Sequence, residues 1–394
     1  MPVFLRGRSL RWLLALLPLA LAGYGAWVAA LALRPEPQPP RAFVPGFAGS
    51  QACAECHAAL VDEHAESHHA HTLATMEQFA ATSPLPEPKW LSDPELPMLT
   101  RAAQKDGVFG VEGQLNGNPL WNPTQWAFGS GTLAMTPVGQ TPNGEWVEAP
   151  VTYYRNAGWD FTVGFLLNDP SLRSRSAAGR PLPPDEINAC FDCHATGVLQ
   201  QKDGPDLSRI EAGVQCERCH GGGAEHIRLA RLGQAKGSIP NPGSGSGAEN
   251  VRFCATCHRL EPPPGTDPDA PVMIRFAPAR LVRSECYTET PGGLSCVSCH
   301  QPHGNSSKDP EHYKKVCSGC HGGQPHLAVC PEQPRGNCVS CHMPREIVMR
   351  NAIFTDHFIR VVRERGSGAP ASARRGPDER ALAAAELAEA TAGR

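Results

Sequence analysis

The chain has 394 residues, enough for two or three average domains, and its formal net charge of −3 argues against nucleic acid as a partner. Cysteine and histidine each occur 16 times, whereas aromatic residues make up only 6% of the chain. This composition is poor in ordinary core residues and rich in metal ligands. We therefore expect something other than leucine and phenylalanine to supply part of the interior.

The N-terminal region contains an uncharged stretch, Trp12–Leu33, that follows three arginines. Its 22 residues suffice to cross the roughly 30 Å hydrocarbon core of a bilayer as a helix. The basic flank favours a cytoplasmic N-terminus with the remainder exported. We expect residues 1–33 to form a transmembrane anchor, with a cleaved signal peptide ending near Ala30–Ala32 as the alternative. A proline-rich linker, 34–48, follows.

The predicted location is accordingly the periplasmic side of a bacterial inner membrane, with the chain attached through its N-terminal helix. Cleavage of a signal peptide would instead give a periplasmic or secreted protein.

One motif, Cys-x-x-Cys-His, occurs seven times and uses fourteen of the sixteen cysteines. It is the attachment signature of c-type haem, in which two thiols add to the vinyl groups and the histidine ligates the iron. A zinc site or a disulfide framework would not require a histidine after every cysteine pair. The sequence therefore predicts seven covalently bound haem c groups. The motifs, numbered 1 to 7 in chain order, are CAECH at Cys53, CFDCH at Cys190, CERCH at Cys216, CATCH at Cys254, CVSCH at Cys296, CSGCH at Cys317 and CVSCH at Cys338.

The motifs also assign the residues that hold each haem. The predicted attachment cysteines are Cys53, Cys56, Cys190, Cys193, Cys216, Cys219, Cys254, Cys257, Cys296, Cys299, Cys317, Cys320, Cys338 and Cys341. The predicted proximal iron ligands are His57, His194, His220, His258, His300, His321 and His342.

The spacing of the motifs indicates the domain organisation. Motif 1 is separated by 132 residues from motif 2, and short aromatic and β-branched runs in this interval predict a small β-rich insertion at 105–167. The later motifs follow one another closely, so their haems would form the core. We expect a mainly α fold with little secondary structure, a haem-packed domain at 49–362 and a flexible tail at 363–394.

Nine histidines remain as candidates for the sixth coordination position. Two imidazoles on one iron are typical of electron carriers, whereas an open position invites a small ligand and chemistry. In "CHQPH", three residues extend at most about 10 Å, so His303 would serve a different haem from His300. The same reasoning applies more loosely to His226 and His326, and a nearby iron also favours ligation by His357.

The cluster "HAESHHAH" should supply at least one further ligand. On a helix, His64, His68 and His71 would share one face, with His69 pointing elsewhere. His312 is a further candidate. A second ligand from the cluster, or Met343, would complete the set for seven haems, and otherwise one haem is five-coordinate.

Two cysteines, Cys286 and Cys330, lie outside the motifs. In an oxidising compartment they are predicted to form a disulfide with each other. A free thiol, or a thiolate on an open iron, is the alternative.

These motifs resemble the multihaem c-type cytochromes related to the cytochrome c-554 family. The resemblance depends on "GSQACAECH…ESHHAHT", "GVQCERCHGGGAEH", "LSCVSCHQPHG", "VCSGCH" and "NCVSCHMP…FTDHFIR", and it runs from about Gly49 to Arg360. It implies a mostly helical fold with stacked and perpendicular haem pairs. It also implies distal ligation by His69, His226, His303 and His357.

The wider superfamily includes hydroxylamine-oxidising and nitrite-reducing enzymes. Their active haems depend on a lysine ligand or a protein–haem crosslink, and no Cys-x-x-Cys-Lys motif occurs here. The favoured function is therefore electron transfer through mostly bis-histidine haems, between a membrane-linked donor and a periplasmic or terminal acceptor. The alternatives are an oxidoreductase that acts on a small nitrogen or sulfur compound at one five-coordinate haem, and a haem-based gas binder.

Overall fold

The computed structural model describes eight stretches of the chain, all within the unit Phe43–Arg394. The stretches are 46–82, 88–92, 98–163, 177–262, 266–290, 292–322, 337–349 and 352–361. The apolar stretch 12–33, the tail 363–394, His326 and Cys330 lie outside the described residues, as does most of the linker.

The prediction of a membrane-anchored protein on the periplasmic side of the inner membrane is corrected. Among the described residues, no helix has the length and hydropathy that a membrane span requires. Trp12–Leu33, on which the prediction depended, belongs to the part of the chain that is not described.

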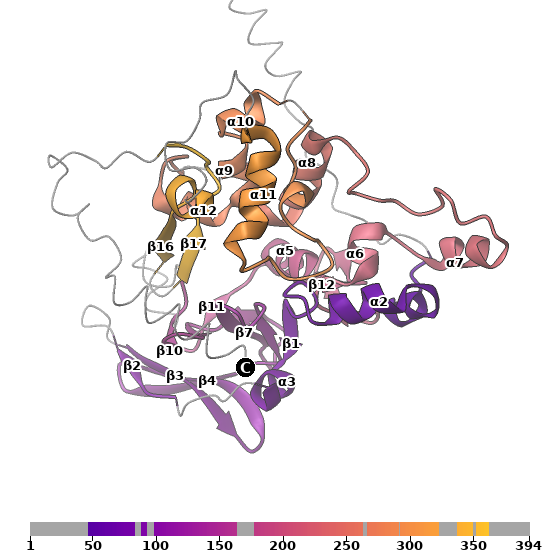
Figure 1. Cartoon of the computed structure of the whole chain (residues 1–394). Helices are drawn as coiled ribbons and strands as arrows, with labels where there is room; N and C mark the ends of the chain where they lie inside the picture. Colours follow the sequence, from indigo (N-terminus) through magenta and orange to yellow (C-terminus); the bar gives the residue numbers. More distant parts are fainter. Residues whose placement is uncertain are drawn as a thin grey trace, which may run out of the picture. The chain divides into compact units, whose positions relative to one another are not determined.

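The prediction of a mainly α fold is wrong, because strands form a substantial part of the structure (Figure 1). They extend on both sides of the expected insertion at 105–167. Short strands such as β1 and β11 carry too few residues for an alternating pattern to be recognised. The strands are β1 (Leu73–Thr75), β2 (Leu91–Ser92), β3 (Met98–Lys105), β4 (Val108–Leu115), β5 (Asn118–Pro123), β6 (Trp126–Phe128), β7 (Ala134–Gln140), β8 (Trp146–Glu148), β9 (Val151–Tyr154), β10 (Gly158–Phe161), β11 (Arg180–Pro181), β12 (Ala195–Thr196), β13 (Leu199–Gln201), β14 (Gly204–Asp206), β15 (Glu211–Ala212), β16 (Arg345–Met349) and β17 (Ala352–Thr355).

The helices are short, and most of them carry a haem motif or lie beside one. The α-helices are α2 (Ala54–Ala65), α3 (Met76–Thr82), α5 (Pro184–His194), α6 (Cys216–His220), α7 (Ala224–Arg231), α8 (Gly247–His258), α9 (Ala277–Leu281), α10 (Glu285–Thr288), α11 (Pro310–His321) and α12 (Cys338–His342). The 3-10 helices are η1 (Ser50–Cys53), η2 (Pro271–Arg275) and η3 (Cys296–Ser298).

Strands β2 to β5 form a four-stranded antiparallel sheet in sequential order. Two-residue turns connect β3 to β4 and β4 to β5, with Asp106–Gly107 and Asn116–Gly117 all at positive φ. Asp-Gly and Asn-Gly are the pairs that such tight hairpin turns favour, since both positions need the left-handed region.

A second, seven-stranded sheet contains β1, β6, β7, β8 and β11 in that order, with β9 paired to β7 and β10 paired to β9. One side of this sheet packs against α5, which carries motif 2. Phe191 of α5 is fully buried and makes edge-to-face contacts with Trp126, Phe128 and Trp146, whose ring centroids lie 5.0 to 5.8 Å away. The sheet thus fixes the position of motif 2.

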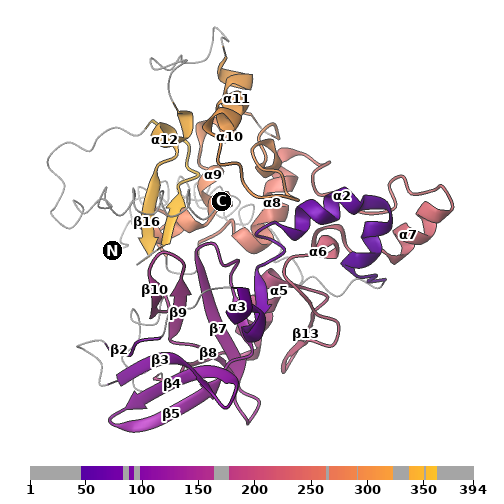
Figure 2. The ribbon, with the colours of Figure 1, turned by 60° about the horizontal axis from the view of Figure 1, so that its bottom comes forward.

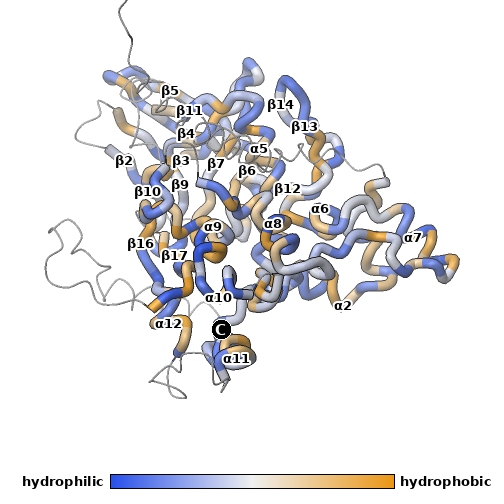
Figure 3. Tube along the Cα trace, turned by 90° about the horizontal axis from the view of Figure 1, so that it is seen from above, coloured by the Kyte–Doolittle hydropathy of each residue, from blue (hydrophilic) through white to orange (hydrophobic). Residues whose placement is uncertain are grey.

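The remaining motifs lie on the helices outside the two larger sheets (Figure 2). Helix α8 begins with a capping box in which the hydroxyl of Ser246 accepts a hydrogen bond from the backbone N–H of Glu249, and the carboxylate of Glu249 accepts one from Ser246. Helices α7, α11 and α12 bury none of their residues. Hydrophilic and hydrophobic residues alternate along α2 and α7 (Figure 3), and Leu60 of α2 and Leu232, at the end of α7, are exposed.

Candidate haem-binding sites

Each motif lies at or near the end of a helix. The motif histidine is the last helical residue of α5, α6, α8, α11 and α12, and in α2 the helix is distorted at His57. On a helix, the two cysteines at i and i+3 lie on the same face, one turn apart. This geometry presents both thiols to one flat group and places the histidine beside them.

Four motif histidines lie opposite a histidine from another part of the chain. The separations between ring centroids are 6.4 Å for His57 and His226, 6.1 Å for His258 and His69, 6.1 Å for His220 and His303, and 6.2 Å for His300 and His357. Two imidazoles on opposite sides of one metal place their centroids roughly 6 Å apart, since each metal–nitrogen bond is about 2 Å long. Each pair therefore has the spacing that a single iron between two imidazoles requires.

Hydrogen bonds orient the rings of several paired histidines and of His194 of motif 2. The Nδ1 atoms of His220, His357 and His194 donate to the carbonyl oxygens of Pro240, Thr355 and Thr72, at 2.8, 3.0 and 2.8 Å. Histidines that ligate a metal usually donate their other ring N–H in this way, which fixes the tautomer and leaves Nε2 available.

The tautomer of His226 follows from its partner, Ser238. The Ser238 hydroxyl donates its one proton to the carbonyl of Ala235 at 2.6 Å, so it accepts from His226 Nδ1 at 2.7 Å. Nδ1 of His226 is therefore protonated, and Nε2 is the free nitrogen.

We expect Ser238→Ala to leave the haem count unchanged and to alter one low-spin signal. The His226 ring loses the acceptor that fixes its orientation, and loss of such a partner lowers metal affinity about 10- to 100-fold. Electron paramagnetic resonance of the oxidised protein, with imidazole-exchange rates, measures the change. Ser244→Ala is the matched control, because the hydroxyl of Ser244 donates to the carbonyl of Asn241 in the same loop at 2.8 Å. An identical response of both variants would contradict the role of Ser238.

The segment His300–His303 contacts three of the histidine pairs. His300 lies opposite His357, and His303 lies opposite His220, so residues three apart belong to different pairs. Between them, the carbonyl of Pro302 accepts a hydrogen bond from the ring of His69. This short segment therefore ties together the sites of motifs 3, 4 and 5.

Burial favours the neutral form of several motif histidines and of their partners. Desolvation, and to a smaller extent the neighbouring His69, lower the pKa of His258 to about 4. Burial likewise lowers the pKa values of His194 and His357. A neutral imidazole is the form that binds a metal, so the environment selects the ligating state.

Cysteines of different motifs lie next to each other. Hydrogen bonds link the thiols of Cys53 and Cys216, of Cys193 and Cys257, of Cys254 and Cys296, and of Cys317 and Cys338. Such a bond raises the pKa of the donating thiol, as in Cys53, Cys193 and Cys296. Motif 1 therefore adjoins motif 3, motif 4 adjoins motifs 2 and 5, and motif 6 adjoins motif 7.

The other candidate ligands have different surroundings. Both ring nitrogens of buried His64 have protein partners, Val214 O at 2.9 Å and Ser67 Oγ at 3.1 Å. Nε2 of His312 donates to the carbonyl of Cys299 at 3.1 Å. His68 and His71 are exposed, and α2 ends at Ala65, so the predicted helical face does not continue through the cluster. His326 lies outside the described residues.

Cys286 is half-buried near Cys299, Cys317 and Cys320 of motifs 5 and 6, and burial raises the pKa of its thiol. Its predicted disulfide partner, Cys330, is not among the described residues. Met343 follows α12 directly as its C-terminal cap.

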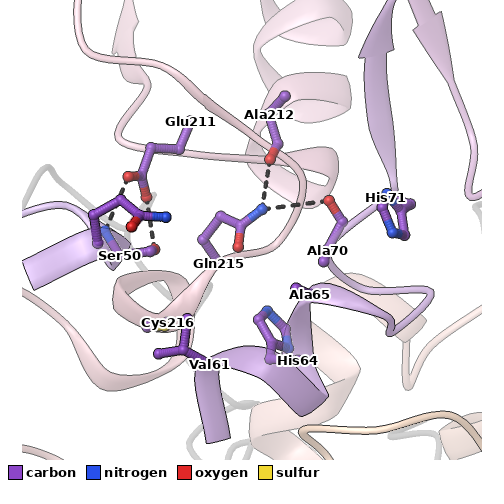
Figure 4. Close-up of a pocket in the computed structure, with 11 residues that line it drawn as sticks. Ser50, Val61, His64, Ala65, Ala70, His71, Glu211, Ala212, Gln215 and Cys216 are labelled. Atoms are coloured by element: carbon purple, nitrogen blue, oxygen red, sulfur yellow. Dashed lines mark hydrogen bonds between the residues drawn. The ribbon is translucent and has the colours of Figure 1, made fainter. Parts of the chain in front are cut away.

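A cavity of about 440 Å³ lies beside Cys216 of motif 3 (Figure 4). Val61 and Ala65 of α2, together with Ala70 and Ala212, give it mainly apolar walls. The amide of Gln215, which also lines the cavity, donates to the carbonyls of Ala70 and Ala212, at 3.3 and 2.7 Å. The cavity suits a flat apolar group attached to Cys216. Cysteine thiols, paired imidazoles and an apolar cavity together fit covalently bound haem.

Sequence reasoning missed residues that hold the motifs together. Glu217, the first variable residue of motif 3, is buried and accepts hydrogen bonds from the backbone N–H groups of Ala48, Gly49 and Gly223 at 2.7 to 2.8 Å. Thr72 accepts from His194 and donates to its carbonyl oxygen at 3.0 Å. The sequence could have indicated a structural role for Glu217, because it is a charged residue between two haem cysteines. No sequence pattern indicates the role of Thr72.

Residues 171–221, which include motifs 2 and 3, match the protein family described as cytochrome c554 and c-prime. A crystal structure of the outer cell wall cytochrome OcwA is similar over 80% of this chain and 80% of that chain, at 14% sequence identity and a TM-score of 0.45. No curated protein matches the chain. The chain is related to the multihaem c-type cytochromes, as the resemblance predicted, and such proteins bind haem c covalently and exchange electrons with redox partners.

Proposed function

We propose that this protein transfers electrons between redox partners through seven haem c groups in the region 49–362. The observation that carries the proposal is the set of four histidine pairs, each joining a motif histidine to one from elsewhere at 6.1 to 6.4 Å. His226, His69, His303 and His357 would be the distal ligands at motifs 1, 4, 3 and 5. His64 and His312, whose Nε2 atoms are already hydrogen-bonded, would not bind iron.

Haem supplies a one-electron centre, and ligation by two imidazoles keeps its iron low-spin in both oxidation states. The chain would contribute the thiols that fix each haem and the neutral histidines that ligate it. Imidazole rings held by protein hydrogen bonds rearrange little when the iron changes its oxidation state, which favours fast electron transfer. The exposed apolar side chains of α2 and of the end of α7, such as Leu60 and Leu232, would pack against the haems.

The contacts between motifs indicate a continuous route. Paired thiols connect motif 1 to 3, motif 2 to 4, motif 4 to 5 and motif 6 to 7. The segment His300–His303 adds the connection between motifs 3 and 5, and the electrostatic interaction of Cys317 with Cys299 joins motif 6 to motif 5. Among the described cysteines, the exposed ones are Cys56, Cys320 and Cys341, in motifs 1, 6 and 7. We therefore place partner contacts at motif 1 and at motifs 6 and 7.

Mass spectrometry and spectroscopy of the purified protein test this function. We expect an intact mass with seven added haems and at least four low-spin haems in the oxidised protein. Stopped-flow mixing with a small reductant should reduce the haems in sequence without turnover of a substrate. Fewer than four low-spin haems would contradict the proposal.

The second candidate function is an oxidoreductase that acts at a five-coordinate haem. Motifs 2, 6 and 7 are the candidate positions, because their histidines have no histidine opposite them among the described residues. His194 is oriented by Thr72 and packed 5.4 Å from Phe128, and no other described histidine forms such a pair with it. A high-spin signal that disappears when nitrite or carbon monoxide binds, together with steady turnover of a nitrogen or sulfur compound, would favour this alternative. A spectrum that is low-spin throughout and inert to both ligands would exclude it.

A further inference from the structure

A buried ion cluster follows β17 and contains one carboxylate between two guanidinium groups. Asp356 is fully buried and Arg280 of α9 is 6% exposed. Nε and Nη2 of Arg280 donate to the two carboxylate oxygens of Asp356 at 2.8 and 2.7 Å, and Nη1 of Arg360 donates to Oδ2 at 2.7 Å. This bidentate geometry fixes the orientation of both partners. Phe358 lies beneath both guanidinium groups, 5.2 and 4.8 Å from their central carbons.

On one side the cluster holds His357, the residue after Asp356. The hydroxyl of Ser284 donates to the carbonyl of His357 at 3.3 Å and accepts from the N–H of Ile359 at 2.9 Å. Ser284 lies three residues beyond α9, the helix that carries Arg280. The segment that supplies Arg280 to the ion pair therefore also fixes the backbone of His357. The ring of His357 lies opposite His300 of motif 5.

On the other side the cluster holds His342 of motif 7. The carbonyl of Arg360 accepts from Nδ1 of His342 at 3.0 Å, and the N–H of Arg360 donates to the carbonyl of His342 at 3.2 Å. The N–H of Asp356 also donates to the carbonyl of Pro344 at 2.9 Å. The segment Thr355–Arg360 therefore contacts the histidines of two different motifs.

We propose that Arg280, Asp356 and Arg360 are positioning residues that lock the haem ligands of motifs 5 and 7 into one unit, so that a charge change in the cluster alters the reduction potentials of both haems together. The proposal rests on the proposed function, in which His357 and His342 ligate iron. A buried charge is weakly screened, so it acts on both sites. Loss of a negative charge favours the reduced iron, whereas loss of a positive charge favours the oxidised iron.

Other carboxylates also lie near the cluster. Asp269 and Glu346 also face Arg280, but Asp269 is 72% exposed on its side chain and pairs with Arg283 at 2.6 Å. Exposed pairs are screened by solvent and salt. Asp269→Asn is therefore a matched control that removes a carboxylate from the same region.

The experiment compares Asp356→Asn, Arg360→Gln and Asp269→Asn with the unaltered protein by spectroelectrochemical titration of all haems. We expect Asp356→Asn to raise the reduction potentials of two haems, and Arg360→Gln to lower them. Each shift should change the reduction equilibrium constant at least tenfold, which is 59 mV for one electron. Asp269→Asn should change the reduction equilibrium constant of either haem by no more than about twofold. Shifts of opposite sign are a result that loosened packing would not give.

A shift of one haem, of none, or of the same sign in both variants would overturn the proposal. Should Asp356→Asn fail to accumulate, the half-exposed Arg360→Gln decides by itself, and an unchanged titration overturns the proposal. His357→Ala separates this proposal from the function on which it rests. If that variant gains no high-spin haem, the proposed ligation fails. If it gains one while both charge variants leave the potentials unchanged, only the proposal about the cluster fails.

Discussion

Replacing His69 with alanine is expected to convert one haem from low-spin to high-spin and to make it bind carbon monoxide. His69 lies 6.1 Å from His258 of motif 4, and Pro302 fixes its orientation. Cys254 and Cys257 would still attach the haem, so the haem count should not change. Electron paramagnetic resonance and carbon monoxide difference spectra measure the conversion. Added imidazole should restore the low-spin state, because it can enter the space that the side chain leaves.

The adjacent residue provides the matched control. His68 is exposed, and its backbone N–H donates a hydrogen bond to the side chain of Asn305 at 2.8 Å. His68→Ala should therefore leave the spin state of every haem unchanged. The opposite outcome, with His68→Ala creating the high-spin haem and His69→Ala without effect, would assign the ligand to His68.

The haem attachment motif can be recognised from the sequence because it depends on local spacing. Two thiols three positions apart and the next histidine must act on one haem, whatever the remainder of the chain does. The family resemblance followed from the residues around these motifs, and it was confirmed. Local spacing does not show which histidines pair. His57 and His226, for example, are 169 positions apart and are brought together by tertiary structure.

The fold class was wrong for a related reason. Strand β1 has three residues and β11 has two, yet both belong to the seven-stranded sheet that supports motif 2. Segments of this length carry no period, and their pairing depends on distant partners. The assignment of His64, His68 and His71 to one helical face failed because α2 ends at Ala65. Helix ends are set by local capping and packing, which histidine spacing does not report.

The largest effect is expected from loss of motif 4, in the variant Cys254→Ser/Cys257→Ser. Cys257 adjoins Cys193 of motif 2, and Cys254 adjoins Cys296 of motif 5, so motif 4 lies between two other motifs. We expect the mass to fall by one haem and the free energy of unfolding to fall by at least about 5 kcal/mol, since emptying even a Phe- or Trp-sized space costs about 3–5 kcal/mol. Electron transfer between motifs 2 and 5 should also be lost. Intact mass, chemical denaturation followed by far-ultraviolet circular dichroism, and stopped-flow reduction measure the three effects.

Two further variants separate the importance of this position from the general effect of losing a cysteine. Cys286→Ser alters a half-buried cysteine outside the motifs and should keep every haem. Cys338→Ser/Cys341→Ser removes motif 7, where Cys341 is exposed and α12 buries no residue. It should lose one haem with a smaller loss of stability, because less of its surroundings depends on the haem for packing. Equal destabilisation by loss of motif 4 and of motif 7 would show that the haems contribute independently, and that motif 4 does not have the central structural role inferred from its contacts with motifs 2 and 5.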